Sequence, residues 1–227
     1  MPLLLKVVRL LHESSELLND SRYSIRTAGH VLQAQAGVTH PDANEYAATP
    51  YRVIRRLLRL LPPESFEGSF IDYGCGRGRV AIVASSYGFR RIIGIEISEV
   101  LYRDASENIR TTSIRSRCNI ELMRANAGRF NIPDDTTVMY LYKPFGATTT
   151  EEVFRRISES MRRRPRQIWI LAYNASLLIE LACTVLRAEL VRRRETIYPA
   201  IPWAALRVSP NACASEDSPA FTSDARR

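Results

Sequence analysis

The sequence predicts an α/β fold: a doubly wound, mainly parallel sheet of about seven strands, with flanking helices and an N-terminal helical cap. From residue 69 onward, strand-like stretches alternate with segments of helical periodicity. Residues 91–96 (RIIGIE) and 167–173 (QIWILAY) are apolar except at their ends, as in strands buried on both faces. We expect three parts, namely a helical cap over residues 1–65, the sheet domain over 66–208 and a polar, disordered tail over 209–227.

The N-terminal part contains two predicted helices. Over residues 1–19, leucines and valines recur at helical spacing opposite charged side chains. Residues 20–45 are polar and are expected to form an irregular connection. Thr49 followed by Pro50 predicts the N-cap and first position of the second helix, which Pro62 ends.

The sheet domain then follows in alternating elements. We expect strands over residues 69–73, 91–96, 119–124, 137–142 and 167–173, with weaker strands near 190–197 and 204–209. We expect helices over residues 78–87, 98–111, about 148–163 and 174–187. Two overlapping capping boxes in TTTEE, residues 148–152, predict the start of the third of these helices.

Composition limits the function classes. The chain has 227 residues and a net charge of +8, and all but two of its 32 basic residues are arginines. A net positive charge can indicate a protein that binds nucleic acid, but an excess of arginine over lysine can also follow from genome composition. The four cysteines are scattered and there are three histidines, so no metal site is expected. No apolar run approaches the roughly 20 residues that span a bilayer, so we expect a cytoplasmic protein without a membrane partner.

The most informative segment follows the first predicted sheet strand, which ends in Asp72. Glycines occupy alternate positions after it, at Gly74, Gly76 and Gly78, and lead into a helix. Glycines let the backbone turn sharply and approach a ligand with no Cβ in the way. Glu96 ends the next strand, 22 residues after Gly74, where a carboxylate can accept both hydroxyls of a ribose.

Two ligands use this geometry. A nicotinamide dinucleotide requires G-x-G-x-x-G, whose third glycine would fall at Arg79, so that pattern fails. The observed D-x-G-x-G-x-G fits S-adenosylmethionine. This ligand carries an ammonium that suits a carboxylate at the loop entrance, and it has no pyrophosphate that would need a cradle.

Here the chain resembles the class I S-adenosylmethionine-dependent methyltransferases. FIDYGCGRG (residues 70–78) matches their first motif, IIGIE followed by IS (92–98) matches their second, and the resemblance covers about residues 46–208. It implies that the domain over 66–208 binds S-adenosylmethionine. The cofactor-binding residues that it implies in these motifs are Asp72, Gly74, Cys75, Gly76, Gly78, Glu96 and Ile97.

Two further segments extend the implied cofactor site. Asn126 and Ala127 follow the third sheet strand, where this family places an adenine-contacting residue. The amide of Asn126 can accept from the adenine amine and donate to a ring nitrogen, although Asn is also a good turn residue. The segment YAATPY from Tyr46 is similar to one that closes over the cofactor in some protein-lysine methyltransferases, which adds Tyr46 and Thr49.

The acceptor pocket is expected after the fourth sheet strand, at Tyr142, Lys143, Pro144 and Phe145. Amine methyltransferases of the family carry Asn/Asp-Pro-Pro-aromatic there. Lys143 is the candidate catalytic residue: a neutral amine could take a proton, and a charged one could orient an anionic substrate. The alternative is a lysine at the rim that points into water. Pro144 disfavours helix at Lys143 and is expected to hold it extended.

These features predict an S-adenosylmethionine-dependent methyltransferase. The expected acceptor is a nitrogen or oxygen nucleophile of a protein side chain or a small molecule. An RNA methyltransferase is one alternative, and it requires the arginine clusters at 162–166 and 192–194 to share a face with the cofactor mouth. A non-catalytic module that binds a cofactor or a partner is the other.

Overall fold

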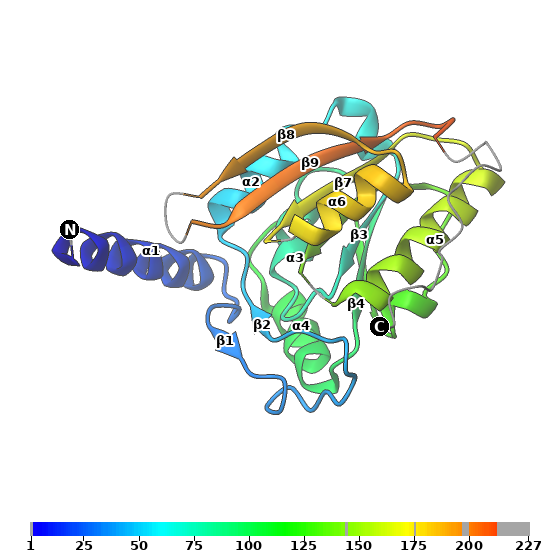
Figure 1. Ribbon diagram of the computed structural model, residues 1–227. Helices are drawn as coiled ribbons and strands as arrows, with labels where there is room; N and C mark the ends of the chain where they lie inside the picture. The colour runs from blue at the N-terminus through cyan, green and yellow to red at the C-terminus, as the bar shows by residue number, and fades with distance from the viewer. Residues whose placement is uncertain (1, 144, 175, 197–199, 213–227) are drawn as a thin grey trace.

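The computed structural model describes residues 2–143, 145–174, 176–196 and 200–212, and it confirms the α/β class (Figure 1). The main strands are β3 (Ser69–Tyr73), β4 (Arg91–Glu96), β5 (Asn119–Arg124), β6 (Thr136–Tyr142), β7 (Ile168–Tyr173), β8 (Glu189–Glu195) and β9 (Pro202–Val208). The α-helices are α1 (Pro2–Arg22), α2 (Tyr51–Leu58), α3 (Arg79–Ser85), α4 (Glu99–Thr111), α5 (Ala147–Arg163) and α6 (Ser176–Val185). The 3-10 helices are η1 (Pro63–Glu67) and η2 (Ala127–Arg129).

The main sheet has seven strands in the order β5-β4-β3-β6-β7-β9-β8. Strands β3 to β7 are parallel to one another, whereas β9 is antiparallel to both of its neighbours, β7 and β8. The chain moves outward from β3 through β4 to β5, and then returns to β6 on the other side of β3. The strand order therefore reverses between β3 and β6. In doubly wound sheets, ligands bind outside the carboxyl ends of the strands at such a point.

Helices cover both faces of the sheet. Side chains alternate across a strand, so Phe70 and Ile71 of β3 enter different apolar clusters. The cluster around Phe70 includes α2 and α3, and Ile109 of α4 packs against it. The cluster around Ile71 includes α5 and α6, for example Phe154. This double cover explains why β4 and β7 are almost entirely apolar, as predicted, whereas the edge strand β5 carries polar, exposed side chains.

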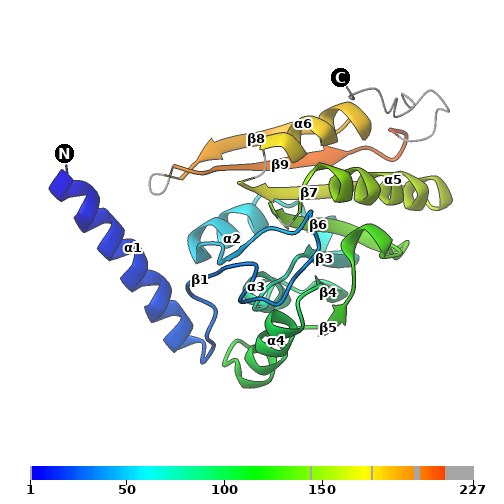
Figure 2. The same ribbon diagram turned by 60° about the horizontal axis from the view of Figure 1, so that its bottom comes forward.

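The N-terminal part differs from the expectation in two details. Helix α1 continues to Arg22, and residues 20–45, expected to be irregular, contain β1 (His30–Val31), which pairs with β2 (Tyr46–Ala47). Figures 1 and 2 show α1 projecting from the sheet domain, with its N-terminal end farthest away. Helix α2 packs in the same cluster as Phe70. The domain boundaries remain predictions, and the tail predicted over 209–227 lies outside the described residues from 213 onward.

Two helix starts differ from the sequence expectation for the same reason. Helix α2 begins at Tyr51 with Pro50 as N-cap, because the Thr49 hydroxyl is bonded to the Tyr140 hydroxyl (2.6 Å). Helix α5 begins at Ala147, and Asp42 accepts from the backbone N–H of Thr149 (2.7 Å), as a local cap would. Long-range partners thus replace the local caps. Within the described residues, no helix is long and apolar enough to cross a membrane.

Candidate functional site

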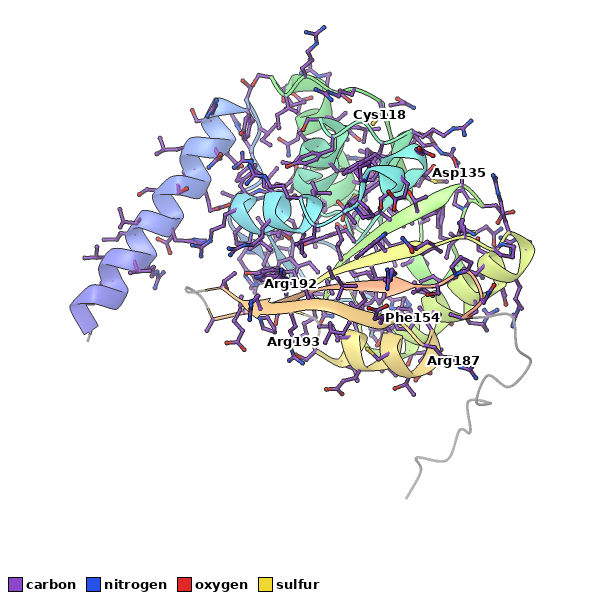
Figure 3. All side chains as sticks on the ribbon, turned by 90° about the horizontal axis from the view of Figure 1, so that it is seen from above. Cys118, Asp135, Phe154, Arg187, Arg192 and Arg193 are labelled. Atoms are coloured by element: carbon purple, nitrogen blue, oxygen red, sulfur yellow. The ribbon has the colours of Figure 1, made fainter. Side chains whose placement is uncertain are left out.

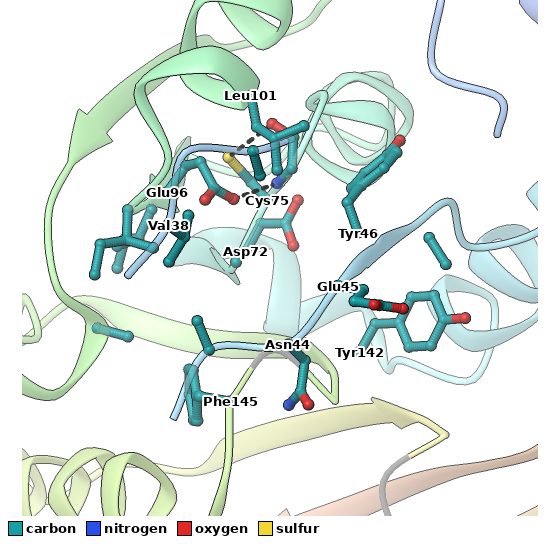
Figure 4. Close-up of a pocket in the computed structure, with 18 of the residues that line it drawn as sticks. Val38, Asn44, Glu45, Tyr46, Asp72, Cys75, Glu96, Leu101, Tyr142 and Phe145 are labelled. Atoms are coloured by element: carbon teal, nitrogen blue, oxygen red, sulfur yellow. Dashed lines mark hydrogen bonds between the residues drawn. The ribbon is translucent and has the colours of Figure 1, made fainter. Parts of the chain in front are cut away.

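A pocket opens at the carboxyl ends of β3, β4 and β6, beside the reversal in strand order (Figure 4). It contains about 950 Å³ of space between atoms, its open mouth included. One wall is the glycine loop, residues 74–78. The opposite wall comes from residues 36–49, here called the strap, which lies across the pocket. The predicted site residues that line this pocket are Asp72, Gly74, Cys75, Gly76, Glu96, Ile97, Asn126, Ala127, Tyr46, Thr49, Tyr142 and Phe145.

The glycine loop turns as predicted. Gly74, Gly76 and Gly78 have φ values of 66°, 55° and 82°, a region that other residues seldom adopt. The loop is pinned to β4 because the Cys75 N–H donates to the Ile95 carbonyl (2.9 Å). Gly78 is the N-cap of α3 and is not among the lining residues, so its part is to shape the turn.

The strap packs directly on this loop. A Cβ placed on Gly76 would overlap the ring of Tyr46. The Tyr46 hydroxyl donates to the carbonyl of Thr27 (2.6 Å), which fixes the ring over the loop. Gly76 therefore serves two needs, a positive φ and a close approach of the strap.

Gly76→Ala should weaken binding of S-adenosylmethionine because the new methyl group displaces Tyr46. Gly37→Ala is the matched control: Gly37 has a similar φ of 64°, but no atom lies within 4 Å of its Cβ position. Both variants should lose about 1–2 kcal/mol of stability from backbone strain. Only Gly76→Ala should lose affinity in calorimetric titrations. Equal affinities in the two variants would show that the Tyr46 contact is unimportant.

Glu96 is buried at the end of β4, and its carboxylate is bonded to the backbone on both sides. Its Oε2 accepts from the Gly76 N–H and its Oε1 from the Ser98 N–H, both at 2.8 Å. Burial raises the pKa of Glu96, while these backbone hydrogen bonds oppose the rise. A carboxylate has about four lone-pair sites, so acceptor sites remain for the hydroxyls of a ribose.

Asp72 is the least satisfied polar group of the site. Its side chain is 2% exposed, it lines the pocket, and Oδ2 has no hydrogen-bond partner among the described residues. Burial raises the pKa of Asp72 to about 8, and the neighbouring charge of Glu96 adds to the rise. An unpaired buried carboxylate is costly unless a cation meets it. The ammonium and sulfonium of S-adenosylmethionine would supply that positive charge, so this residue fits the cofactor.

Cys75 contributes to the shape of the pocket wall. Its thiol is buried, and Gly94 of β4 leaves room for it: a Cβ on Gly94 would lie 3.1 Å from Sγ. Burial and the carboxylates of Asp72 and Glu96 hold the pKa of Cys75 well above its ordinary value. The thiol is therefore protonated at neutral pH and is a poor nucleophile.

The side-chain amide of Asn126 has hydrogen-bond partners within the protein, as expected for a turn residue. Its Oδ1 accepts from the Gly128 N–H (2.8 Å) and caps η2, and its Nδ2 lies 3.3 Å from Nε2 of His40. Asn126 and Ala127 line the pocket together with Ile97. The direct pairing with adenine stays a prediction, with part of the amide already occupied by the turn.

Aromatic side chains line the other end of the pocket. Tyr140 is buried, whereas Tyr142 is half-buried and packs against Tyr173, with ring centroids 4.7 Å apart. Phe145 forms an isolated antiparallel bridge with Ala43 of the strap. The strap thus touches both the glycine loop and the segment after β6. Both predicted acceptor residues, Tyr142 and Phe145, line the pocket.

The expectation for Lys143 is wrong in its geometry. Its φ is 36°, so the backbone is not extended, and the side chain is exposed and not among the lining residues. Pro144 lies outside the described residues. No proton transfer is assigned to Lys143, and the rim alternative describes its position.

Lys143→Met should leave turnover within a few-fold of the parent, because an exposed rim residue contributes little to a buried reaction centre. The measurement is release of S-adenosylhomocysteine at saturating cofactor. A loss of about 10²-fold, as for a positioned acid–base group, would restore Lys143 as a catalytic residue.

The sequence patterns do not mark most of the strap residues, or Arg79, as residues of the site. Pocket residues that it did not select include Ala36, Val38, His40, Ala43, Asn44, Glu45, Ala47, Ala48, Arg79, Tyr140 and Thr149. The segment 20–45 has neither a strong period nor a motif, so only the resemblance at Tyr46 and Thr49 signalled its position. Arg79 was noted only because it is not glycine.

Comparison with known proteins agrees with this geometry. A family described as "Methyltransferase domain" matches residues 70–164. A protein-lysine N-methyltransferase of Saccharolobus islandicus (strain REY15A) is 31% identical over 94 residues, which are 41% of this chain and 56% of that protein. The chain thus spans just over half of this relative's length.

Solved structures share the fold. An RNA methyltransferase from Salinibacter ruber in complex with S-adenosyl-L-homocysteine has a TM-score of 0.52 at 18% identity, covering 80% of this chain and all of that one. A magnesium protoporphyrin IX methyltransferase from Synechocystis PCC 6803 with bound SAM has a TM-score of 0.50 at 16% identity, covering 69% of this chain and 75% of that one. Residues 70–164 therefore match a methyltransferase domain, and the sheet that contains them has the Rossmann-like fold of the solved S-adenosylmethionine-dependent methyltransferases.

Proposed function

We propose that the chain is an active methyltransferase that methylates the side-chain amine of lysine in a protein. The observation that carries this proposal is the pocket itself. It holds the carboxyl group of Asp72, whose Oδ2 has no hydrogen-bond partner among the described residues, and it is lined by the aromatic side chains of Tyr142 and Phe145. The curated relative, named a protein-lysine N-methyltransferase, supports the choice of acceptor.

The mouth of the pocket suits a lysine side chain. Glu45 and Asn44 are exposed strap residues that line it, as Tyr142 does (Figure 4). The Glu45 carboxylate contacts Nε2 of His30 (2.9 Å) and retains acceptor sites that can attract a lysyl ammonium. Tyrosine faces also interact well with cations. The long aliphatic stem of lysine can pack between aromatic walls. Deeper in, loss of water favours the neutral amine that must attack.

When bound, S-adenosylmethionine supplies a methyl group activated by its sulfonium. The residues of this chain have positioning tasks. Asp72 would pair with the positive charge of the cofactor and Glu96 would accept from its ribose. The strap and Tyr46 would exclude water, so that alignment and desolvation provide most of the rate gain. The acceptor amine can lose its proton to solvent before it enters, and no protein base is required.

The nucleic-acid alternative has less support. Among the lining residues only Arg79 is an arginine, and it is 3% exposed and paired with carboxylates. Arg166 donates to the carbonyls of Thr136, Ser160, Arg164 and Pro133, which is a structural role. Arg192 and Arg193 lie on the outer strand β8 (Figure 3). Strands β7 and β9 separate β8 from β6, roughly 14 Å at the usual strand spacing.

The test is transfer of tritiated methyl from S-adenosylmethionine into protein, RNA and small-molecule fractions of a cell extract, with excess S-adenosylhomocysteine as the control. We expect label in protein, recovered as methyl-lysine after total hydrolysis. Label in RNA alone would support the RNA alternative. Binding of the cofactor without label in any fraction would support a non-catalytic module.

A further inference from the structure

A buried cluster of charges joins the N-terminal helix to the methyltransferase domain. Arg79, at the first position of α3, is 3% exposed. Its guanidinium pairs with Glu16 and with Asp20 (3.1 Å), both from α1. It also lies over the ring of Tyr51, 4.2 Å from the centroid, and donates to the hydroxyl of Thr27 (2.6 Å). Helix α1 is therefore attached through its C-terminal half, while its N-terminal half projects outward (Figure 2).

Asp20 is the most highly coordinated member of this cluster. Its carboxylate accepts from the N–H and hydroxyl of Thr27, from the N–H of Ala28 and from the hydroxyl of Tyr51, at 2.5 to 2.7 Å. Burial works against ionisation of Asp20, but the hydrogen bond from Tyr51 and the charge of Arg79 bring its pKa below the ordinary value. Asp20 is thus a buried anion, and removing its charge leaves Arg79 undercompensated.

The same cluster holds the strap. Arg79 donates to the Thr49 carbonyl (2.9 Å), and Thr49 in turn bonds Tyr140 (2.6 Å). Thr27, held by Asp20, accepts from the Tyr46 hydroxyl through its carbonyl (2.6 Å). Two connections, one through Thr27 and one through Arg79, therefore lead from Asp20 to Tyr46, which packs on the glycine loop, and to Thr49, which is bonded to Tyr140.

We propose that Asp20 and Glu16 of α1 are positioning residues for the cofactor site. Neither lines the pocket. They act through Arg79 and Thr27, which keep Tyr46 and Thr49 closed over the glycine loop. The N-terminal helix is then a working part of the cofactor site. This inference rests on the proposed use of the pocket for S-adenosylmethionine.

The far end of the strap is anchored separately. Asp42 accepts through its carbonyl from the Gly146 N–H (2.8 Å) and through Oδ2 from the Thr149 N–H (2.7 Å). Loss of the α1 contacts should therefore loosen residues 44–49 while residues 40–43 stay attached. This gradient along the strap distinguishes positioning by α1 from a general loss of structure.

The test uses Asp20→Asn and Glu16→Gln in the full chain, with Glu13→Gln as the matched control. Glu13 lies on the same helix, and its carboxylate accepts from Arg9 on the surface. The readouts are the dissociation constant for S-adenosylhomocysteine by calorimetry and hydrogen exchange in the cofactor-free protein. Glu16→Gln is the milder change and keeps the test valid if Asp20→Asn folds poorly.

We expect Asp20→Asn and Glu16→Gln to raise the dissociation constant by roughly two- to thirtyfold, the range for residues coupled to a site that they do not touch. Exchange should rise in residues 44–49 more than in 40–43, and Glu13→Gln should behave as the parent. Folded variants with parental affinity and parental strap exchange would overturn the inference. Failure of the parent itself to bind S-adenosylhomocysteine would instead contradict the proposed function.

Discussion

Glu96→Ala is expected to raise the dissociation constant for S-adenosylmethionine by roughly tenfold to hundredfold. A carboxylate that accepts two ribose hydroxyls contributes about 1.5–3 kcal/mol in hydrogen bonds to a charged group. The substitution also removes the acceptor of the Gly76 and Ser98 N–H groups, which lie in the buried part of the site. We therefore expect a lower melting temperature as well, with the sheet domain still folded at room temperature.

Calorimetric titration and thermal melting measure the two effects. Glu107→Ala is the control, because Glu107 is an exposed residue of α4 whose carboxylate pairs with Arg110. The control should change neither quantity appreciably. If Glu96→Ala melts lower but binds as the parent does, Glu96 only supports the glycine loop and the ribose assignment is wrong.

Asp72→Asn should abolish the pH dependence of cofactor binding. In the cofactor-free protein the pKa of Asp72 is about 8, and a bound cation would lower it. Below that pH, binding must expel a proton, so the affinity of the parent should fall by roughly tenfold for each pH unit. The amide side chain of the variant carries no such proton. Calorimetry between about pH 6 and pH 8 should show a steep slope for the parent and a weaker, nearly flat response for Asp72→Asn.

Stability should show the opposite pH trend. Because the pKa of Asp72 is raised from 3.8 to about 8 in the folded protein, the unfolded chain releases this proton first as pH increases. The contribution of Asp72 to the free energy of unfolding therefore decreases across that window. Asp72→Asn should melt higher than the parent at alkaline pH, with the difference vanishing in acid. A parent affinity that does not change with pH would contradict the assignment of Asp72 to a cation.

The sheet could be predicted because its signals are local. A parallel strand buried on both faces must be apolar along its length, and β4 and β7 carry that pattern in consecutive residues. The turn of the glycine loop could also be predicted, because positive φ values at alternate positions favour glycine. The positions of Asp72 and Glu96 follow from their strands, because Asp72 is the penultimate residue of β3 and Glu96 is the last residue of β4.

The strap could not be predicted because its partners are distant in sequence. Thr49 followed by Pro50 has the pattern of a helix cap, but the Thr49 hydroxyl is hydrogen-bonded to the hydroxyl of Tyr140, which lies 91 residues later in the chain. The sequence TTTEE predicts a local capping box at the start of α5. Instead, the Thr149 N–H donates to the carboxylate of Asp42, which lies 107 residues earlier in the chain. Lys143 had the expected position after β6, but a left-handed backbone at that residue turned it outward. For Thr49 and for the start of α5, a tertiary contact overrode a local preference.

Titration of the purified chain with S-adenosylmethionine and with NAD tests the central claim most directly. The geometry predicts heat of binding for S-adenosylmethionine, one molecule per chain, displaced by S-adenosylhomocysteine and reduced in Glu96→Ala. It predicts no binding of NAD, because the third glycine of a dinucleotide loop is replaced by Arg79, which pairs with Glu16 and Asp20. Tight binding of NAD with no response to S-adenosylmethionine would contradict the account.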